Sequence, residues 1–342
     1  MKIEIVEHWN KLLQKIPIEK RDIYFTEEYV RLSIIDDRKA YCIVCQENKN
    51  IILMPFRRGK VGTRYDFETP YGYGGPISNC EDPNWLKRAL QCITEYFYEH
   101  NYLCGFIRFH PLLKNSTICQ DYMKVIDDRY TIAIDTSMTE DEIWRTQISS
   151  KNRNMIRKAK KNGLTFEADE SFQYINEFEL LYNATMDRLH AESFYFLDSK
   201  YYDEFKKNMV GHGFIGIVRA HDHIIGAALF MIYGPYGHYH LAGSDRSMAT
   251  YGINNFLLWN AAKKMHESGV HWFHLGGGLN GDPENSLFKF KKSFSSNLFQ
   301  FSIGKIVIDE KAYENICKDW ERRYPELVPK YHNFLLKYRF ME

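Results

Sequence analysis

The stretch from Tyr239 to Phe294 constrains the fold of this chain more than any other part of the sequence. It contains an apolar strand, a polar loop, a helix and a second strand that runs into Gly276-Gly277-Gly278. Within the helix, positions 253, 256, 257 and 261 are apolar, which predicts one buried face, and Gly269 is a stop signal. We therefore predict a strand, a crossover helix and a second strand that lies beside the first.

Two strands joined in this way end at the same edge of a sheet, and the helix begins at that edge. Backbone N–H groups converge there, and such an edge binds anionic or acyl groups. We expect Gly276 and Gly277 to let a substrate lie close to the backbone. The run 276–281 also spells G-x-G-x-x-G, but too little chain follows it for a dinucleotide domain.

Turn and periodicity signals predict a similar alternation of elements in both halves. In the first half we expect a hairpin, then a helix, then two strands (41–45 with 51–56; 83–100; 103–109 and 130–134). Thr139 and Glu142 form a capping box, which predicts a helix of about 20 residues that Gly163 ends. Two helices and three strands complete the prediction (171–190 and 198–209; 214–219, 224–233 and 238–242).

Several motifs resemble the Fem family of peptidoglycan-bridge aminoacyltransferases and its relatives in the acetyltransferase (GNAT) superfamily. They cover roughly the C-terminal half: a basic helix at 151–159 with Asn162-Gly163 behind it, an arginine-bearing helix at 185–194, Leu257-Leu258, Gly276-Gly277, and Phe290-Lys291 ahead of Phe294. Ser293 and Ser295 depart from the family pattern, which has small glycines there.

The resemblance implies an α/β fold with mixed sheets, in two tandem GNAT-like domains. We place the N-terminal domain at 1–136 and the C-terminal domain at 137–309, and expect 310–342 to be a helical segment that packs on the first domain. Long paired heptads are absent from the sequence, so the coiled-coil arm of some family members is not expected.

Amide formation by attack of an amine on an activated carbonyl needs a neutral amine, an orienting cleft and stabilisation of the oxyanion. Lys291, which follows Phe290, is the candidate for a charge that stabilises the transition state or the leaving group; a solvated lysine is the alternative. His240 and His274 are candidates for proton removal, or core histidines. No metal site is predicted, because the paired histidines have no identifiable third ligand.

Substrate-binding candidates are the groups that bind phosphates, carboxylates, sugars or peptides. A guanidinium binds such anions bidentately, and tyrosines pack on sugars and peptides. The run 151–161 holds six basic residues and no acid, which favours phosphate contact, although a helix with one apolar face and a solvated basic end fits the same pattern. The candidates are Arg188, Tyr195, Tyr71, Tyr73, Tyr251, Gly276, Gly277, Arg153 and Arg157.

The segment Arg246–Gly252 lies where coenzyme-A acetyltransferases have their pyrophosphate loop. Ala249 and Tyr251 stand at the two positions that are small in that loop, and their side chains crowd the space where a diphosphate meets N–H groups. This weakens a coenzyme-A interpretation without eliminating it.

The 45 basic and 44 acidic residues nearly cancel, so the chain as a whole has no net charge that would draw it to nucleic acid or to a membrane. The first 21 residues lack a signal-peptide core, and the longest apolar run, 224–233, is far shorter than the ~20 residues that span a bilayer. Seven cysteines, an odd count, do not suggest a secreted disulfide framework. We expect a cytoplasmic protein with reduced thiols, and peripheral membrane contact stays open.

These observations predict an acyltransferase that forms an amide between an activated aminoacyl group and an amine of a cell-envelope precursor. The precursor is expected to belong to peptidoglycan or to a polysaccharide, and to be linked to a nucleotide or a lipid. The expected donor is aminoacyl-tRNA, with no tightly bound cofactor. One alternative is an acyl-coenzyme-A-dependent N-acetyltransferase of a small amine or amino sugar. Another is a non-catalytic module for RNA binding or envelope assembly.

Overall fold

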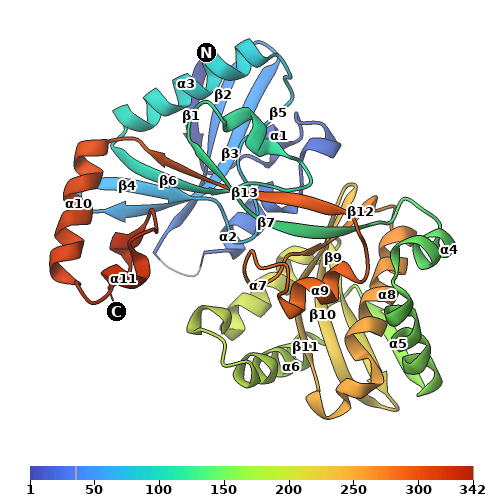
Figure 1. The fold of residues 1–342 in the computed structure, drawn as a ribbon. Helices are drawn as coiled ribbons and strands as arrows, with labels where there is room; N and C mark the ends of the chain where they lie inside the picture. The colour runs from blue at the N-terminus through green and yellow to red at the C-terminus, as the bar shows by residue number, and fades with distance from the viewer. Residues whose placement is uncertain (35–36, 342) are drawn as a thin grey trace. The chain divides into compact units, whose positions relative to one another are not determined.

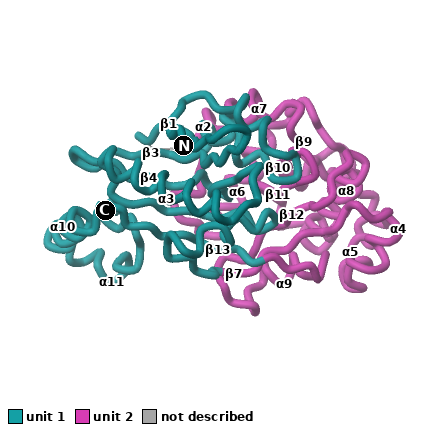
Figure 2. Tube along the Cα trace, turned by 90° about the horizontal axis from the view of Figure 1, so that it is seen from above, with its two compact units in different colours: residues 1–128, 300–342 teal, residues 129–299 magenta. Residues whose placement is uncertain are grey.

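The computed structural model describes residues 1–34 and 37–341, so only Glu342 of the predicted terminal segment lies outside the description. The chain divides into two compact units, which Figure 2 colours separately. Unit 1 comprises residues 1–128 and 300–342, and unit 2 comprises residues 129–299.

Unit 1 is a mixed sheet with helices packed against it (Figure 1). Its strand order is β1-β2-β3-β4-β6-β13, and β5 pairs with β3. The strands are β1 (Lys2–Val6), β2 (Lys39–Glu47), β3 (Asn50–Val61), β4 (Arg64–Glu68), β5 (Ile77–Ser78), β6 (Tyr102–Arg108) and β13 (Leu298–Val307). The helices are α1 (Asn10–Leu13), α2 (Glu27–Leu32), α3 (Pro83–Glu99), α10 (Glu310–Arg323) and α11 (Val328–Tyr331).

Unit 2 is built in the same way (Figure 1). Its strand order is β7-β12-β11-β10-β9-β8. The strands are β7 (Lys124–Asp135), β8 (Leu164–Asp169), β9 (Gly213–Ala220), β10 (His223–Tyr233), β11 (Tyr236–Ser244) and β12 (Trp272–Gly276). The helices are α4 (Glu140–Glu142), α5 (Ser150–Lys161), α6 (Ile175–Arg188), α7 (Ser199–Met209), α8 (Ile253–Glu267) and α9 (Ser286–Lys292).

Each unit contains one parallel strand pair within an otherwise antiparallel sheet. In unit 1, β4 and β6 are parallel and α3 connects them; in unit 2, β11 and β12 are parallel and α8 connects them. Buried apolar residues of α8, including Phe256, Leu257 and Met265, join the core of unit 2. The predicted strand, crossover helix and second strand are therefore confirmed, as is the α/β fold class.

The last strand of each unit comes from a distant part of the chain. β7 follows β6 in sequence but pairs with β12, and β13 follows α9 but pairs with β6. Both pairings are antiparallel. The chain thus leaves unit 1 along β7 and returns to it along β13.

The prediction of one continuous helix between Thr139 and Gly163 is wrong. The capping box is present, but α4 passes into a π-helical turn at Ile143–Gln147, and Ile148 is extended at ψ 121°. Ser149 then caps α5 through its side chain. The Gln147 amide donates to the carbonyl of Asp135 at 2.8 Å, a tertiary contact that helix periodicity does not reveal.

The C-terminal segment is attached to unit 1 through a buried ion pair. Asp66 on β4 has no exposed surface, and both of its carboxylate oxygens accept from Arg339, each at 2.6 Å. The Tyr338 hydroxyl donates to the same carboxylate at 2.9 Å.

We predict that Arg339→Ala lowers the free energy of unfolding by ~3–5 kcal/mol, because removing one partner leaves a buried carboxylate without its counter-charge. Urea denaturation followed by circular dichroism measures the change. The control is Arg322→Ala, which breaks the exposed Arg322–Asp319 pair and should cost less than ~1 kcal/mol. Equal losses in the two variants would contradict the prediction.

Candidate active site

The site in unit 2 centres on the side chain of Lys291, which lies in the last turn of α9. Asn285 begins this helix by accepting from the N–H groups of Leu287 and Phe288. Lys291 is 9% exposed, and its ammonium Nζ donates to the carbonyl of Gly277 at 2.9 Å. The helix thus directs a cation toward the loop that follows β12.

Burial lowers the pKa of Lys291 to about 8. The aromatic ring of Tyr239, on β11, lies 5.8 Å from Nζ, a distance at which the face of a ring attracts a cation. Burial also raises the pKa of the Tyr239 phenol, which therefore stays neutral. Near neutral pH the amine is mostly charged, and a small change in its surroundings can remove the proton.

The parallel strands separate next to this lysine. β11 and β12 pair only from Tyr236 with Trp272 to His238 with His274, although β11 continues to Ser244 and β12 to Gly276. The register of β11 against β10 also shifts at His240, which is the extra residue of a bulge. The two strand ends therefore diverge where Gly276 and Gly277 follow β12.

The glycines give the loop a backbone that other residues do not readily adopt. Gly276 has φ +75°, and a Cβ atom there would lie 3.3 Å from the Lys291 Nζ. A Cβ at Gly277 would lie 2.9 Å from the carbonyl oxygen of Tyr130. The structure thus brings Gly276, Gly277 and Lys291 together.

Apolar side chains pack around the site. Phe290 is half-buried and stacks edge-on against Phe294, with ring centroids 5.4 Å apart. Tyr251, which ends the turn before α8, is also half-buried and packs against the core of unit 2. Both rings therefore contribute apolar packing in this part of unit 2.

The two histidines proposed as bases lie on β11 and β12. The His240 Nε2 is 2.8 Å from the Tyr201 hydroxyl, and its ring stacks on Phe205. Burial, followed by the charge of His238, lowers the pKa of His240 to about 3, so this imidazole is neutral and a weak base. His274 is 2% exposed and packs edge-on against His238, with centroids 5.7 Å apart.

Arg188 and Tyr195 lie at the end of α6 and in the turn after it. Arg188 is exposed, and its guanidinium donates to the carbonyl of Ser244, at the end of β11, at 3.3 Å. The Tyr195 carbonyl accepts from the Tyr182 hydroxyl at 3.0 Å. Arg188 is thus held at the open end of β11 and retains guanidinium donors for an anion.

The two arginines of α5 have different roles. Arg153 donates to the carbonyls of Trp144, Arg145 and Ile148, which close the end of the π-helical turn, so its guanidinium serves the fold. Arg157 is exposed and lies over the Trp144 ring at 5.4 Å. Arg157 and the other exposed cations of this helix together form the α5 basic surface, which consists of Lys151, Arg157, Lys158, Lys160 and Lys161.

Tyr71 and Tyr73 belong to a glycine-rich loop of unit 1. The Tyr71 side chain is 48% exposed, and its carbonyl accepts from the Tyr29 hydroxyl at 2.9 Å. Tyr73 packs edge-on against Tyr24 and His110, at 5.2 and 5.4 Å between centroids. Of these two tyrosines, Tyr71 presents the larger surface to a ligand.

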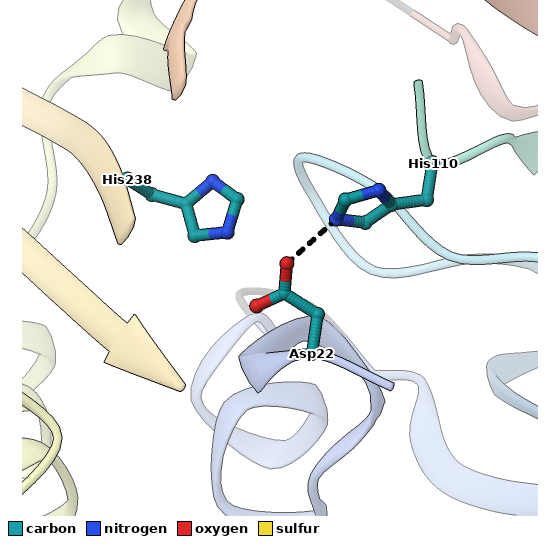
Figure 3. Close-up of side chains that lie close together, drawn as sticks. All are labelled: Asp22, His110 and His238. Carbon is teal, nitrogen blue, oxygen red and sulfur yellow. Dashed lines mark hydrogen bonds and ion pairs between the residues drawn. The ribbon is translucent and has the colours of Figure 1, made fainter. Parts of the chain in front are cut away.

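His110 is fixed by a buried hydrogen bond to Asp22 within unit 1, which Figure 3 shows. Its Nδ1 accepts from the N–H of Leu113 at 3.3 Å, so Nε2 carries the proton and donates to Asp22 at 2.7 Å. Neither Asp22 nor His110 has exposed surface. The pair holds the rings on which Tyr73 packs.

The arrangement in unit 2 can hold an acyl group against the backbone and stabilise negative charge with a desolvated ammonium. Tyr239 was not predicted as a site residue, although it is the first residue of the stretch 239–294 that most constrains the fold. The hydrogen bond from Lys291 to the Gly277 carbonyl could not be predicted from the sequence, since it depends on the path of the loop after β12.

The comparison with protein families matches residues 148–291 to the family described as acetyltransferase (GNAT) domain. This stretch contains α5, the parallel pair, α8 and Lys291 itself. This part of the chain is therefore similar to acetyltransferase domains. No curated protein sequence is similar enough to this chain to count as a relative.

Solved structures share the fold over nearly the whole chain. The crystal structure of FemX has a TM-score of 0.73 at 14% identity and covers 92% of this chain and 100% of its own. The C-terminal domain of a protein assigned as a lysylphosphatidylglycerol synthetase, from Agrobacterium fabrum, has a TM-score of 0.57 at 16% identity and covers 86% and 90%. A tandem GNAT protein from the clavulanic acid biosynthesis pathway has a TM-score of 0.51 at 8% identity and covers 90% and 99%.

These similarities confirm the predicted resemblance at the level of the fold, which is that of two GNAT-like domains in tandem. No helix among residues 1–34 and 37–341 combines the length and the apolar character that a bilayer-spanning helix needs.

The lowered pKa of Lys291 predicts how stability depends on pH. The unfolded lysine has a pKa near 10.5 and the folded one about 8, so between these values the unfolded chain binds more protons and stability rises with pH. We expect the unfolding free energy of the wild type to rise relative to Lys291→Met by on the order of 3 kcal/mol from pH 7 to 10.5. Denaturant titrations at several pH values measure this, and a pH-independent difference would contradict it.

Proposed function

We propose that this protein is an acyltransferase that joins an activated aminoacyl group to an amine of a cell-envelope precursor. The observation that carries the proposal is the buried Lys291 ammonium beside Gly277, where β11 and β12 separate inside the acetyltransferase domain. Attack of a neutral amine on an acyl carbonyl creates an oxyanion. A desolvated cation next to a glycine loop suits that charge.

Lys291 acts in this proposal by its charge. Because the site is poorly hydrated, an ammonium stabilises a developing negative charge more strongly there than it would in water. The charge falls on the carbonyl oxygen or on the leaving oxygen of the donor. Phe290, Gly276 and Gly277 shape the space in which the acyl group lies.

Arg188 binds a phosphate or carboxylate of the acceptor, since its guanidinium is exposed at the end of β11. Tyr71 offers an exposed ring for a sugar or a peptide, supported by Tyr73. His240 and His274 are the candidates for receiving the amine proton, and the lowered pKa of His240 makes its imidazole a weak base.

The proposed donor is aminoacyl-tRNA. The α5 basic surface supports it, because in the part of the chain that the structure describes no carboxylate forms an ion pair with these five residues. Similarity of fold to FemX favours a cell-wall acceptor, and similarity to the lysylphosphatidylglycerol synthetase domain fits an envelope acceptor more broadly.

An acyl-coenzyme-A donor is the second candidate, favoured by the match to an acetyltransferase family. The turn at Arg246–Tyr251 leads into α8 through Gly252, which has φ +77°. Helix N-termini of this kind accept diphosphates. Calorimetric titration with acetyl-coenzyme A and with a charged tRNA separates the two donors.

We predict that Lys291→Met lowers kcat by roughly 10²–10³-fold with little change in KM, because a charge that acts in the transition state is lost. In the wild type, kcat should fall above pH 8 as the ammonium loses its proton. The assay is amide formation from a charged tRNA, or from acetyl-coenzyme A if that donor binds. The control is Lys292→Met, an exposed neighbour. A wild-type kcat that keeps rising from pH 8 to 9.5 would assign the neutral amine instead.

We predict that the triple variant Lys158→Glu, Lys160→Glu, Lys161→Glu raises KM for a tRNA donor roughly tenfold or more, an effect that shrinks with added salt. The matched control reverses Lys311, Lys318 and Arg323, which are exposed on α10. Loss of all function in the α5 variant, together with tolerance of Lys291→Met, would favour the non-catalytic RNA-binding module instead.

A further inference from the structure

Three polar side chains form a continuous bridge between α8, α5 and α9. The amide of Asn255 donates to the Asn152 side-chain oxygen at 2.7 Å, and the Asn152 amide donates to the Ser293 hydroxyl oxygen at 2.8 Å. The Ser293 hydroxyl donates in turn to the carbonyl of Phe290 at 2.5 Å. We call Asn255, Asn152 and Ser293 the polar bridge.

The bridge is shielded from water at its centre. Asn152 is 3% exposed, and both ends of its amide are used. Because a buried amide that loses a partner is left unsatisfied, the three side chains hold each other in one arrangement. The direction of donation runs one way, from α8 through α5 to α9.

The bridge ends two residues from Lys291. Ser293 closes α9, and its own backbone carbonyl accepts from the N–H of Ser149 at 2.9 Å. The last turn of α9 is thus attached to the start of α5 by a backbone bond and a side-chain bond. That turn carries Lys291, whose Nζ must reach the carbonyl of Gly277.

We propose that Asn152 and Ser293 are positioning residues, which hold the last turn of α9 so that the Lys291 ammonium stays at the Gly277 carbonyl. The inference rests on the proposed role of Lys291 in acyl transfer. A glycine at position 293 has no hydroxyl, so it cannot receive the Asn152 amide or donate to the Phe290 carbonyl. Ser293 therefore attaches the end of α9 through its hydroxyl group, whereas a glycine there would only make the backbone more flexible.

The titratable groups near Lys291 are few. Tyr239 faces it from β11, and Lys289 and Lys292 lie on its own helix, both exposed. Arg129 on β7 reaches the carbonyls of Gly278 and Leu279 in the adjacent loop. A shift in the titration of Lys291 in a bridge variant thus reports a change in its burial.

The test compares Ser293→Gly and Asn152→Ala with Asn260→Ala in the full chain. Asn260 is a buried asparagine of α8 whose amide donates to the carbonyl of Phe256 in the same helix, and it serves as the matched control. Two readouts are measured: kcat and KM, and the pH dependence of Lys291 acetylation by acetic anhydride, followed by mass spectrometry. The second readout needs no enzyme activity.

We expect kcat to fall roughly tenfold or more in both bridge variants with KM within about twofold, because a displacement of about 1 Å can cost as much as 10²-fold. The pKa that governs acetylation of Lys291 should rise from about 8 toward the ordinary lysine value, since the ammonium gains access to water. Ser293→Thr keeps a hydroxyl and should retain wild-type behaviour. The double variant should be no worse than either single one, since the two share a hydrogen bond.

An unchanged titration of Lys291 in Ser293→Gly and Asn152→Ala overturns the inference. So does an equal change in Asn260→Ala, which would show a general loss of stability. If the chain transfers no acyl group but the bridge variants shift the titration, positioning of Lys291 stands and the proposed function fails.

Discussion

The structure of unit 2 depends on the pairing of two parallel strands that stay together for only three residue pairs. Parallel strands need a crossover connection, and α8 supplies it while placing its own start at the strand ends. Beyond His238 and His274 the strands separate and no longer pair with each other. Lys291 from α9 and the glycines after β12 are placed around this opening.

Burying the Lys291 ammonium costs free energy, which its lowered pKa reflects. The cost is partly offset by the Gly277 carbonyl and by the ring of Tyr239. A cation kept in this state is already desolvated before a substrate arrives, so it need not shed water when negative charge develops. Polar groups without partners are also costly when they are buried, which explains why Asn152 and Ser293 hydrogen-bond to each other.

Periodicity predicted most elements, because the apolar positions of α8 and the alternation in β9 to β11 reflect which face is buried. The parallel pair followed from the length of the connection. The break at Ile148 could not be predicted from the sequence, since it depends on a tertiary contact of Gln147 with Asp135. Lys291 was found through a resemblance, whereas Tyr239 and Asn152 were not selected as site residues, because a buried tyrosine or asparagine in a sequence looks the same whether it supports a core or a site.

The exchange of β7 and β13 between the two halves of the chain has a consequence for synthesis on the ribosome. Unit 1 receives its last strand, β13, only after all of unit 2 has been made. The edge of β6 that β13 covers therefore stays unpaired while about 190 further residues, between Arg108 and Leu298, emerge, which at roughly 5–20 residues per second takes on the order of ten seconds or more. An exposed strand edge invites wrong pairing. The first half of the nascent chain therefore carries this unpaired edge until β13 is made.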